Sequence, residues 1–197
     1  MKAAPATVGF RVKSGWATGV LVAGPASAPR ALDRRVVELS DPAMPTSRQP
    51  YHAVMGAAGA ASRRVEERLL RVVTGATERS IRELLERYRD AGHAIRAAAL
   101  VVGSVIDPAR IANDHIRAHA LEGALFRTAL ATALDSQGVP CSVVVEREAY
   151  VRAAALLKRT EAQLRRAVTE LGRSLDGPWR ADEKTATLAA WMALQRR

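Results

Sequence analysis

The sequence has few aromatic residues and a single cysteine. Aromatic side chains make up 4% of its 197 residues, whereas apolar residues as a whole make up 48%. The core must therefore be built mainly from Ala, Val and Leu, which suits close packing of helices on a sheet. Cys141 is the only cysteine, which excludes an intrachain disulfide and a cysteine-based zinc site and fits a reducing compartment.

Long apolar runs are also lacking. No stretch approaches the roughly 18 apolar residues that a membrane-spanning helix needs. The apolar stretch at the start of the sequence is interrupted by Arg11, Lys13 and several glycines, unlike the core of a signal peptide. We therefore expect a cytoplasmic protein without a membrane partner, and the length predicts one domain over residues 1–197.

Lysine is scarce although the chain is basic. Lys and Arg number 30 against 20 Asp and Glu, for a net charge of +10, and because only four of the 30 are Lys, 26 are Arg. Part of this bias, with the abundant Ala, is typical of a GC-rich genome. The planar guanidinium of Arg nevertheless binds phosphate through paired hydrogen bonds. The charge therefore favours a polyanionic partner such as nucleic acid.

The pattern of apolar residues predicts three strands followed by alternating helices and strands. The spacing predicts strands over 6–12, 17–23, 31–39, 94–103 and 141–146. It predicts helices over 53–91 (one long helix, or two in tandem), 114–136, 148–172 and 181–195. This β-β-β-α-β-α-β-α-α order predicts an α/β protein with a ribonuclease-H-like mixed five-stranded sheet and helices on both faces.

Two short motifs resemble those of the ribonuclease-H-like superfamily, in particular nucleases related to the Holliday-junction resolvases. VGFRVKSGWATGVLV resembles the first hairpin of that family, whose first strand reads roughly V-G-I-D before a Lys/Gly turn and Gly-Trp. DEKTATLAAW, residues 182–191, resembles its last helix, which begins with D-E-x-D-A-x-A. The resemblance implies a nuclease ancestry, in which carboxylates of the first strand, fourth strand and last helix hold Mg²⁺.

The acids implied by the resemblance are incomplete in this sequence. Arg11 occupies the acid position of the first strand, and a cation there should repel a metal ion. Asp182 and Glu183 remain in the last helix, but Thr185 occupies the position of the next acid in the D-E-x-D motif. The nearest acid after the fourth strand is Asp107. An intact two-metal centre is therefore not expected. A relocated set of Glu38, Asp107, Asp182 and Glu183 is the alternative, with Mg²⁺ as its cofactor.

Polar residues follow the strands where this class of sheet binds ligands, beyond the carboxyl ends of the parallel strands. Arg11, Lys13 and Ser14 follow the first strand, and Glu146 and Arg147 follow the last. We expect these side chains to bind a ligand.

A polar segment, SRQPYH, precedes the long helix expected over 53–91. Its Arg48, Tyr51 and His52 are candidate ligand-binding residues, because a helix N-terminus presents unpaired N–H groups to anions. The alternative is that the segment only caps the helix.

Two histidines lie four residues apart in NDHIRAHALEG, residues 113–123. His115, His119 and Glu122 share one helix face, and such a set can bind a transition metal or transfer protons. It can also bind a ligand together with Arg117, without metal, or have a structural role. We assign no metal site from this spacing, and we count His115, Arg117 and His119 as candidate ligand-binding residues.

Two further surfaces are candidates for contacts with a partner. Arg152, Arg159 and Arg166 recur every seven residues in the helix expected over 148–172, which predicts a basic stripe or a solvated face. Leu188, Trp191 and Met192 give the last helix an apolar face that can meet a second subunit in a homodimer.

The sequence as a whole favours a protein that binds a phosphate-bearing partner such as nucleic acid, with a degraded nuclease metal centre. The alternatives are a metal-dependent nuclease or phosphodiesterase that uses Asp107, Asp182 and Glu183, and a non-catalytic protein-interaction module. Whether the protein is an enzyme is left open at this point.

Overall fold

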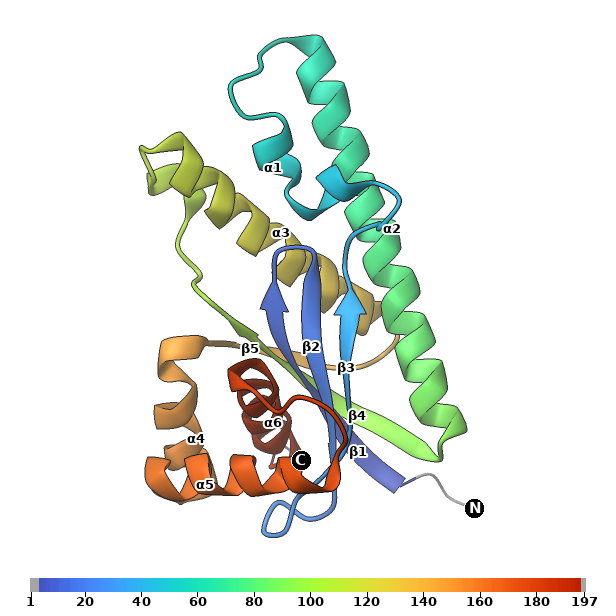
Figure 1. Ribbon diagram of the computed structural model, residues 1–197, viewed down its shortest axis with the longest axis vertical. Coiled ribbons are helices and arrows are strands. Elements are labelled where there is room, and N and C mark those ends of the chain that lie inside the picture. The colour runs from blue at the N-terminus through green and yellow to red at the C-terminus, as the bar shows by residue number, and fades with distance from the viewer. Residues whose placement is uncertain (1–3, 196–197) are drawn as a thin grey trace.

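The computed structural model describes residues 4–195, which form one mixed five-stranded sheet with its helices (Figure 1). The strands are β1 (Ala4–Lys13), β2 (Trp16–Ala23), β3 (Arg30–Glu38), β4 (His93–Val102) and β5 (Cys141–Val145), in the order β3-β2-β1-β4-β5. The first three strands are antiparallel neighbours, whereas β4 is parallel to both β1 and β5. This arrangement confirms the predicted ribonuclease-H-like fold.

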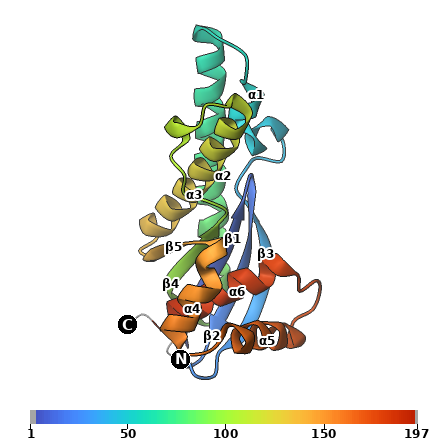
Figure 2. The same ribbon diagram turned by 90° about the vertical axis from the view of Figure 1, so that its left-hand side faces the viewer.

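Helices cover both faces of the sheet, as Figures 1 and 2 show. They are α1 (Pro50–Ala53), α2 (Ala60–Asp90), α3 (Asp114–Ser136), α4 (Ala149–Leu157), α5 (Glu161–Leu171) and α6 (Ala181–Leu194). Short 3-10 helices lie at Pro45–Arg48, Pro108–Arg110, Glu146–Glu148 and Gly172–Ser174. One face packs against α2 and α3, and α6 lies on the other with α4 and α5 packed beside it. None of the helices within residues 4–195 is long and apolar enough to cross a membrane.

The side chains of β1 alternate between the two faces of the sheet, as the period of a strand requires. Val8, Phe10 and Val12 enter the core beneath α2 and α3. The intervening residues face α6. Thr7 Oγ1 donates a hydrogen bond to the carbonyl oxygen of Ala190 at 2.8 Å, and the Nε of Arg11 lies 3.9 Å from Asp182 Oδ1.

The contact between β1 and α6 is closest at Gly9. A Cβ atom on Gly9 would lie 1.9 Å from the carbonyl oxygen of Ala186, so the helix backbone rests directly on the strand. Two residues of a strand and four residues of a helix both span about 6 to 7 Å. Thr7, Gly9 and Arg11 therefore meet successive turns of α6, which runs antiparallel to β1. This register brings Arg11 to the first turn of the helix.

Two predicted helices differ from those in the structure. The helix expected over 53–91 begins only at Ala60, after a segment in which Gly56 and Gly59 have φ of 79° and 94°, and it is one continuous helix and not two in tandem. The helix expected over 148–172 ends at Lys158, whose φ is 52°, and α5 begins after Thr160, which caps it. A left-handed residue ends helical hydrogen bonding, and neither apolar spacing nor composition signalled it at Lys158.

The interruption at Lys158 removes the basic stripe predicted along one helix. Arg152 lies on α4 and Arg166 on α5, while Arg159 falls between them. Arg159 instead stacks over the ring of Trp191, with its guanidinium carbon 5.2 Å from the ring centroid, and donates to the carbonyl oxygen of Ser27. Of the two alternatives, the continuous stripe was wrong because the three arginines are not on a common helix, while Arg152 and Arg166 are exposed as a solvated face requires.

The apolar face predicted for a second subunit lies inside the chain. Leu188, Trp191 and Met192 of α6 are buried in a core shared with residues of α4 and α5. Their burial removes the surface on which the homodimer was predicted, because α6 is covered on the side away from the sheet.

The upper part of α2 and the start of α3 extend beyond the strands together with α1 (Figures 1 and 2). These three segments contact one another, and we call them the helical extension. The carboxyl end of β1 points toward this extension, as does the connection from β4 to α3. The sheet rim at which ligands bind in this class of fold therefore adjoins the helical extension.

The close approach at Gly9 predicts a large effect of adding one methyl group. Gly9→Ala should lower the free energy of unfolding by about 3 kcal/mol or more, because α6 must move away from β1. Gly75→Ala is the matched control, since the nearest atom to a Cβ there is Arg79 Nη1 at 3.6 Å. It should stabilise α2 by about 0.5–1 kcal/mol. Urea unfolding of both variants tests this, and equal effects would contradict the packing.

Candidate functional site

A buried arginine occupies the rim of the sheet where β1 ends. Arg11 is 6% exposed and its guanidinium makes a two-pronged ion pair with Glu146, with Nε 3.2 Å from Oε1 and Nη2 2.5 Å from Oε2. Its Nη1 donates to the carbonyl oxygen of Val12 at 2.8 Å. Glu146 follows β5 directly, so this ion pair links the carboxyl ends of two strands.

The first turn of α6 completes the cluster. Asp182 Oδ1 lies near two cations, with Lys13 Nζ at 3.2 Å and Arg11 Nε at 3.9 Å. Two cations and two carboxylates thus meet at the ends of β1, β5 and the start of α6. We call Arg11, Lys13, Glu146 and Asp182 the rim ion cluster. Its charges balance among themselves, so the cluster has no need of a metal ion for neutrality.

Glu183, the neighbouring acid of α6, is used within the chain. Its Oε2 accepts a hydrogen bond from the backbone N–H of Arg180 at 2.8 Å and so caps the helix. Its Oε1 lies 3.4 Å from Arg34 Nη1, and the side chain is nearly buried. A carboxylate that caps its own helix and pairs with Arg34 is not free to hold a metal ion.

The structure does not gather the acids of the alternative nuclease reading. Asp107 is exposed and accepts a hydrogen bond from the N–H of Ala109, and Glu38 pairs with Arg48 at 3.3 Å. Within residues 4–195 no three carboxylates lie close enough to share one ion. A Mg²⁺ site made from Glu38, Asp107, Asp182 and Glu183 is therefore not formed by this arrangement.

Other predicted rim residues lie around the cluster. Ser14 is half-buried in the β1–β2 turn, and the Arg48 side chain covers Gly15 of the same turn. Arg147 is 81% exposed and faces Glu148 at 3.9 Å. A cavity of about 450 Å³ beside it is lined by the following side chains: Glu146, Arg147, Tyr150, Glu161, Arg165, Ala181, Lys184 and Thr185. The cluster therefore opens to a pocket whose wall carries both signs of charge.

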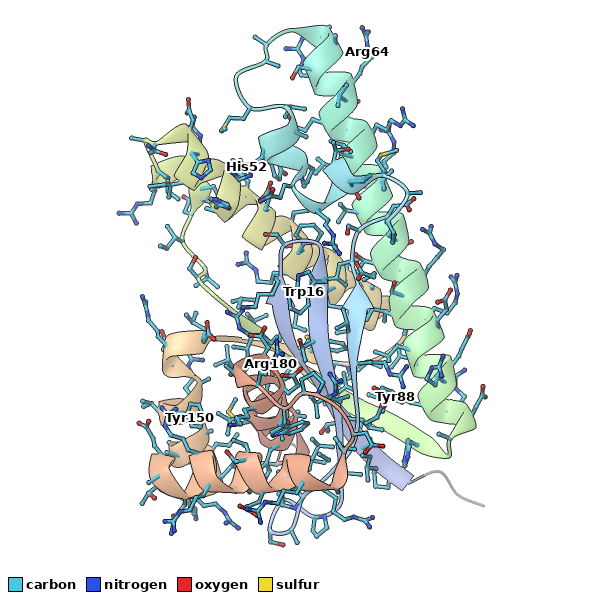
Figure 3. The ribbon with its side chains drawn as sticks, viewed as in Figure 1. Trp16, His52, Arg64, Tyr88, Tyr150 and Arg180 are labelled. Atoms are coloured by element: carbon cyan, nitrogen blue, oxygen red, sulfur yellow. The ribbon has the colours of Figure 1, made fainter. Side chains whose placement is uncertain are left out.

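The histidines predicted in two separate segments come together in the helical extension. His52 of α1 meets His115 and His119 of α3, with ring centroids 4.3 to 4.8 Å apart. Figure 3 shows His52 pointing toward α3. Sequence spacing linked only His115 and His119, because the contact of His52 with α3 depends on how α1 folds back. Beside the rings lies Glu122, which is completely buried.

Two neighbours of the histidines have structural roles. Arg117 donates to the carbonyl oxygen of Ile111 at 3.1 Å and pairs with Asp114, so it braces the start of α3. Burial raises the pKa of the Tyr51 hydroxyl, with smaller contributions from the carboxylates of Glu66 and Glu122. Tyr51 is therefore neutral at physiological pH. The four-residue length of α1 also means that SRQPYH does not lead directly into a long helix.

The only thiol is not a reactive group. Burial raises the pKa of Cys141 to about 11, so the side chain is protonated near neutral pH. A thiol must be ionised to act as a nucleophile or metal ligand. The chemistry of the site is therefore carried by carboxylates, histidines and arginines.

An arginine stripe that the sequence reasoning missed runs along α2. Positions 64, 68, 71, 75, 79, 82, 86 and 89 recur at steps of three or four and so lie on one helix face. Six of them are exposed arginines: Arg64, Arg68, Arg71, Arg79, Arg82 and Arg89. The other two are Gly75 and Glu86. We call these six arginines the arginine stripe.

The arginines of the stripe make no ion pairs among the described residues. The apolar face of α2 is on the other side, where Leu69, Val73 and Ile81 are buried. The signal was present in the sequence, since the stripe lies opposite the apolar spacing that predicted the helix. Glutamates at other positions of α2 made the row of arginines less apparent in the sequence.

Comparison with known proteins identifies the fold. No protein-family model and no curated protein matches the sequence. The structure is similar to that of RuvC from Thermus thermophilus, with a TM-score of 0.55, 15% identity and coverage of 96% of this chain and 93% of that chain. RuvC in complex with a Holliday junction substrate gives a TM-score of 0.55 at 17% identity, covering 96% of this chain and 92% of that one.

A further solved structure has a similar architecture. The yeast mitochondrial Holliday junction resolvase Ydc2 gives a TM-score of 0.50 at 9% identity, over 98% of this chain and 79% of that chain. The similarity to these structures confirms the ribonuclease-H-like fold that the sequence predicted.

Replacing Arg11 by an acid should convert the rim ion cluster into a cation site. Arg11→Asp places a third carboxylate beside Glu146 and Asp182, and it should lower the free energy of unfolding by about 2–3 kcal/mol without divalent ions. Mg²⁺ or Mn²⁺ should then raise its melting temperature, because oxygen ligands bind these ions.

The control is Arg11→Asn, which removes the same ion pair without adding a negative charge. Scanning calorimetry with and without Mg²⁺ should show no rise for Arg11→Asn or for the unaltered protein. An equal rise for all three proteins would mean that the ions act elsewhere.

Proposed function

We propose that this protein binds nucleic acid through phosphate contacts and does not hydrolyse it at the sheet rim. The observation that carries the proposal is the arginine stripe of α2, whose six guanidinium groups have no ion pairs among residues 4–195. From Arg64 to Arg89 an α-helix spans about 38 Å. A row of free arginines of that length suits a phosphate backbone, whose charges are evenly spaced.

The composition of the surface supports a nucleic acid rather than a small anion. The chain carries a net charge of +10, and the stripe contributes exposed positive charge along one line and not in a closed pocket. Arginine binds phosphate oxygens with two hydrogen bonds. Aromatic side chains are scarce, so base stacking contributes little and we expect weak dependence on base sequence.

The rim ion cluster supports binding without metal-dependent cleavage. Arg11 stands at the end of β1, where the resemblance implies an acid, and it holds Glu146 and Asp182 in ion pairs. The guanidinium between the two carboxylates occupies the space that Mg²⁺ would need, and together with Lys13 it already balances their negative charge. In this proposal the rim ion cluster has a structural role, in which it holds the first turn of α6 against the sheet.

Branched DNA is the first ligand to test. RuvC of Thermus thermophilus, which has this fold, has been seen in complex with a Holliday junction substrate. A four-way junction, a duplex and a single strand of matched sequence therefore cover the structures that such a scaffold can bind.

Binding to these nucleic acids should weaken steeply with salt. The logarithm of affinity for duplex DNA should fall with the logarithm of salt concentration by about 0.9 for each phosphate that the protein neutralises. Replacing Arg64, Arg68 and Arg71 together by Gln should lower that slope by about 0.9 for each phosphate that the variant no longer neutralises. Fluorescence anisotropy over a range of roughly 50 to 200 mM salt measures both quantities.

The matched control removes the same charge away from the stripe. Arg63, Arg87 and Arg166 are exposed and unpaired among the described residues, and their joint replacement by Gln should leave the slope nearly unchanged. An equal effect of both triple variants would indicate attraction by net charge alone. Absence of binding would favour the protein-interaction module.

Cleavage is tested on the same substrates. With Mg²⁺ or Mn²⁺ added, the junction, duplex and single strand should stay intact, because no acid cluster is formed at the rim. Cleavage that is absent in Asp182→Asn would instead establish the nuclease alternative. Cleavage that survives in Asp182→Asn would point to a contaminating enzyme.

A further inference from the structure

Three histidine side chains converge on one point between α1 and α3. The ligand nitrogens of His52, His115 and His119 all lie within 4.8 Å of one another. The Nε2 atoms of His115 and His119 are 3.2 Å apart. Two nitrogens bound to a tetrahedral zinc ion at about 2.0–2.1 Å lie about 3.3 Å apart. The spacing of this pair therefore fits two ligands of one ion.

The buried Glu122 sets the orientation of His52. Its Oε1 lies 2.7 Å from His52 Nδ1 and also accepts a hydrogen bond from the backbone N–H of His52 at 3.3 Å. In the tautomer in which Nδ1 donates to this oxygen, the proton is on Nδ1. The Nε2 atom of a neutral His52 then carries a free lone pair, and it is buried without a hydrogen-bond partner among the described residues.

The same carboxylate is directed toward a second ring. Glu122 Oε2 lies 3.8 Å from His119 Nδ1 and has no hydrogen-bond partner within residues 4–195. Metal-bound histidines typically donate their other N–H to a carboxylate, which fixes the ring and makes the ligating nitrogen more basic. Glu122 is placed to do this for His52 and, after a small movement, for His119.

The charge of Glu122 also calls for a cation. Its side chain is completely buried, and within residues 4–195 it has no Lys or Arg partner. A buried carboxylate is costly unless a positive charge or hydrogen bonds compensate it, and within residues 4–195 only Oε1 of Glu122 has hydrogen bonds. A divalent ion held by the three rings supplies that charge close to the carboxylate and gives His52 Nε2 a partner.

We propose that His52, His115 and His119 bind a divalent transition-metal ion of the zinc class through their Nε2 atoms, with Glu122 orienting the rings. Nitrogen ligands favour zinc and related ions over Mg²⁺. His115 is exposed and the His119 side chain is half-exposed, so the fourth position of a tetrahedral ion faces solvent. The site is therefore of the open, three-histidine kind, which takes water or a ligand oxygen as its fourth partner.

This site is separate from the rim ion cluster in its residues and its ligand chemistry. It is built on α1 and α3, whereas the rim cluster is built on β1, α6 and the residue that follows β5. The metal proposal consequently does not depend on nucleic-acid binding, and either can fail without the other.

A competing arrangement uses the same rings without an ion. One neutral imidazole of the pair His115 and His119 can donate a hydrogen bond to the other across 3.2 Å. That arrangement leaves His52 Nε2 without a partner and Glu122 without a cation, whereas a metal ion satisfies both. The two arrangements differ in whether the protein binds an ion stoichiometrically.

The test uses the full chain without an affinity tag, freed of metal by a chelator and titrated with Zn²⁺ by calorimetry. We expect one ion per chain. Co²⁺ bound in its place should give the visible absorption of a tetrahedral ion. Glu122→Gln should lower the Zn²⁺ affinity about 10- to 100-fold. His52→Gln and His119→Gln, which each remove a ligand, should lower it further.

The fourth histidine provides the matched control. His93 begins β4 and is not part of the cluster, so His93→Gln should bind Zn²⁺ as the unaltered chain does. Circular dichroism of each metal-free variant checks folding, and His52→Gln and His119→Gln carry the test if the buried Glu122→Gln does not fold. The proposal is overturned if the unaltered chain binds no ion, if both ligand variants retain its affinity, or if His93→Gln loses it equally.

Discussion

The close packing of α6 on β1 is the contact on which the rest of the structure depends. With no side chain at Gly9, the helix backbone lies directly on the strand, and Ala186 and Ala190 fill the contact without separating them. Because α6 packs directly on the sheet, α4 and α5 cover its outer side. The same contact sets the register of β1 on α6, so that Arg11 meets Asp182 in the first turn of α6 at the sheet rim.

At the rim, ion pairs hold the carboxyl ends of two strands and the first turn of α6 together. A metal centre at this point would join β1 to α6 through carboxylates and ions. Here Arg11 makes the corresponding connection with Glu146 and Asp182, and Lys13 adds a second cation. The ion pairs are partly buried, and removing one partner leaves its neighbours without a counter-charge. The residues are therefore coupled as a unit even without a metal.

The helical extension carries the groups that the rim lacks. Its histidines and Glu122 form a set of nitrogen ligands with an orienting carboxylate, and α2 carries the arginine stripe along its outer face. The two features differ in chemistry. One suits a single ion with a small ligand, and the other suits an extended polyanion. The histidines lie where α1 and α3 extend beyond the strands, whereas the arginine stripe runs from the helical extension along the whole of α2.

The sequence by itself determined the order of strands and helices, because apolar residues recur at the period of each element. The position of Arg11, where an acid is expected, was identified from the resemblance of the first hairpin to the ribonuclease-H-like superfamily and not from the period of β1. The spacing of the α2 arginines and the capping box of Thr160 and Gln163 were also present in the sequence, although neither led to a prediction. The left-handed φ of Lys158 and the exposure of the arginines required the backbone. Only the tertiary structure could show that His52 contacts Glu122, which lies 70 positions away in the sequence. The reason is that no local spacing of residues indicates that α1 packs against α3.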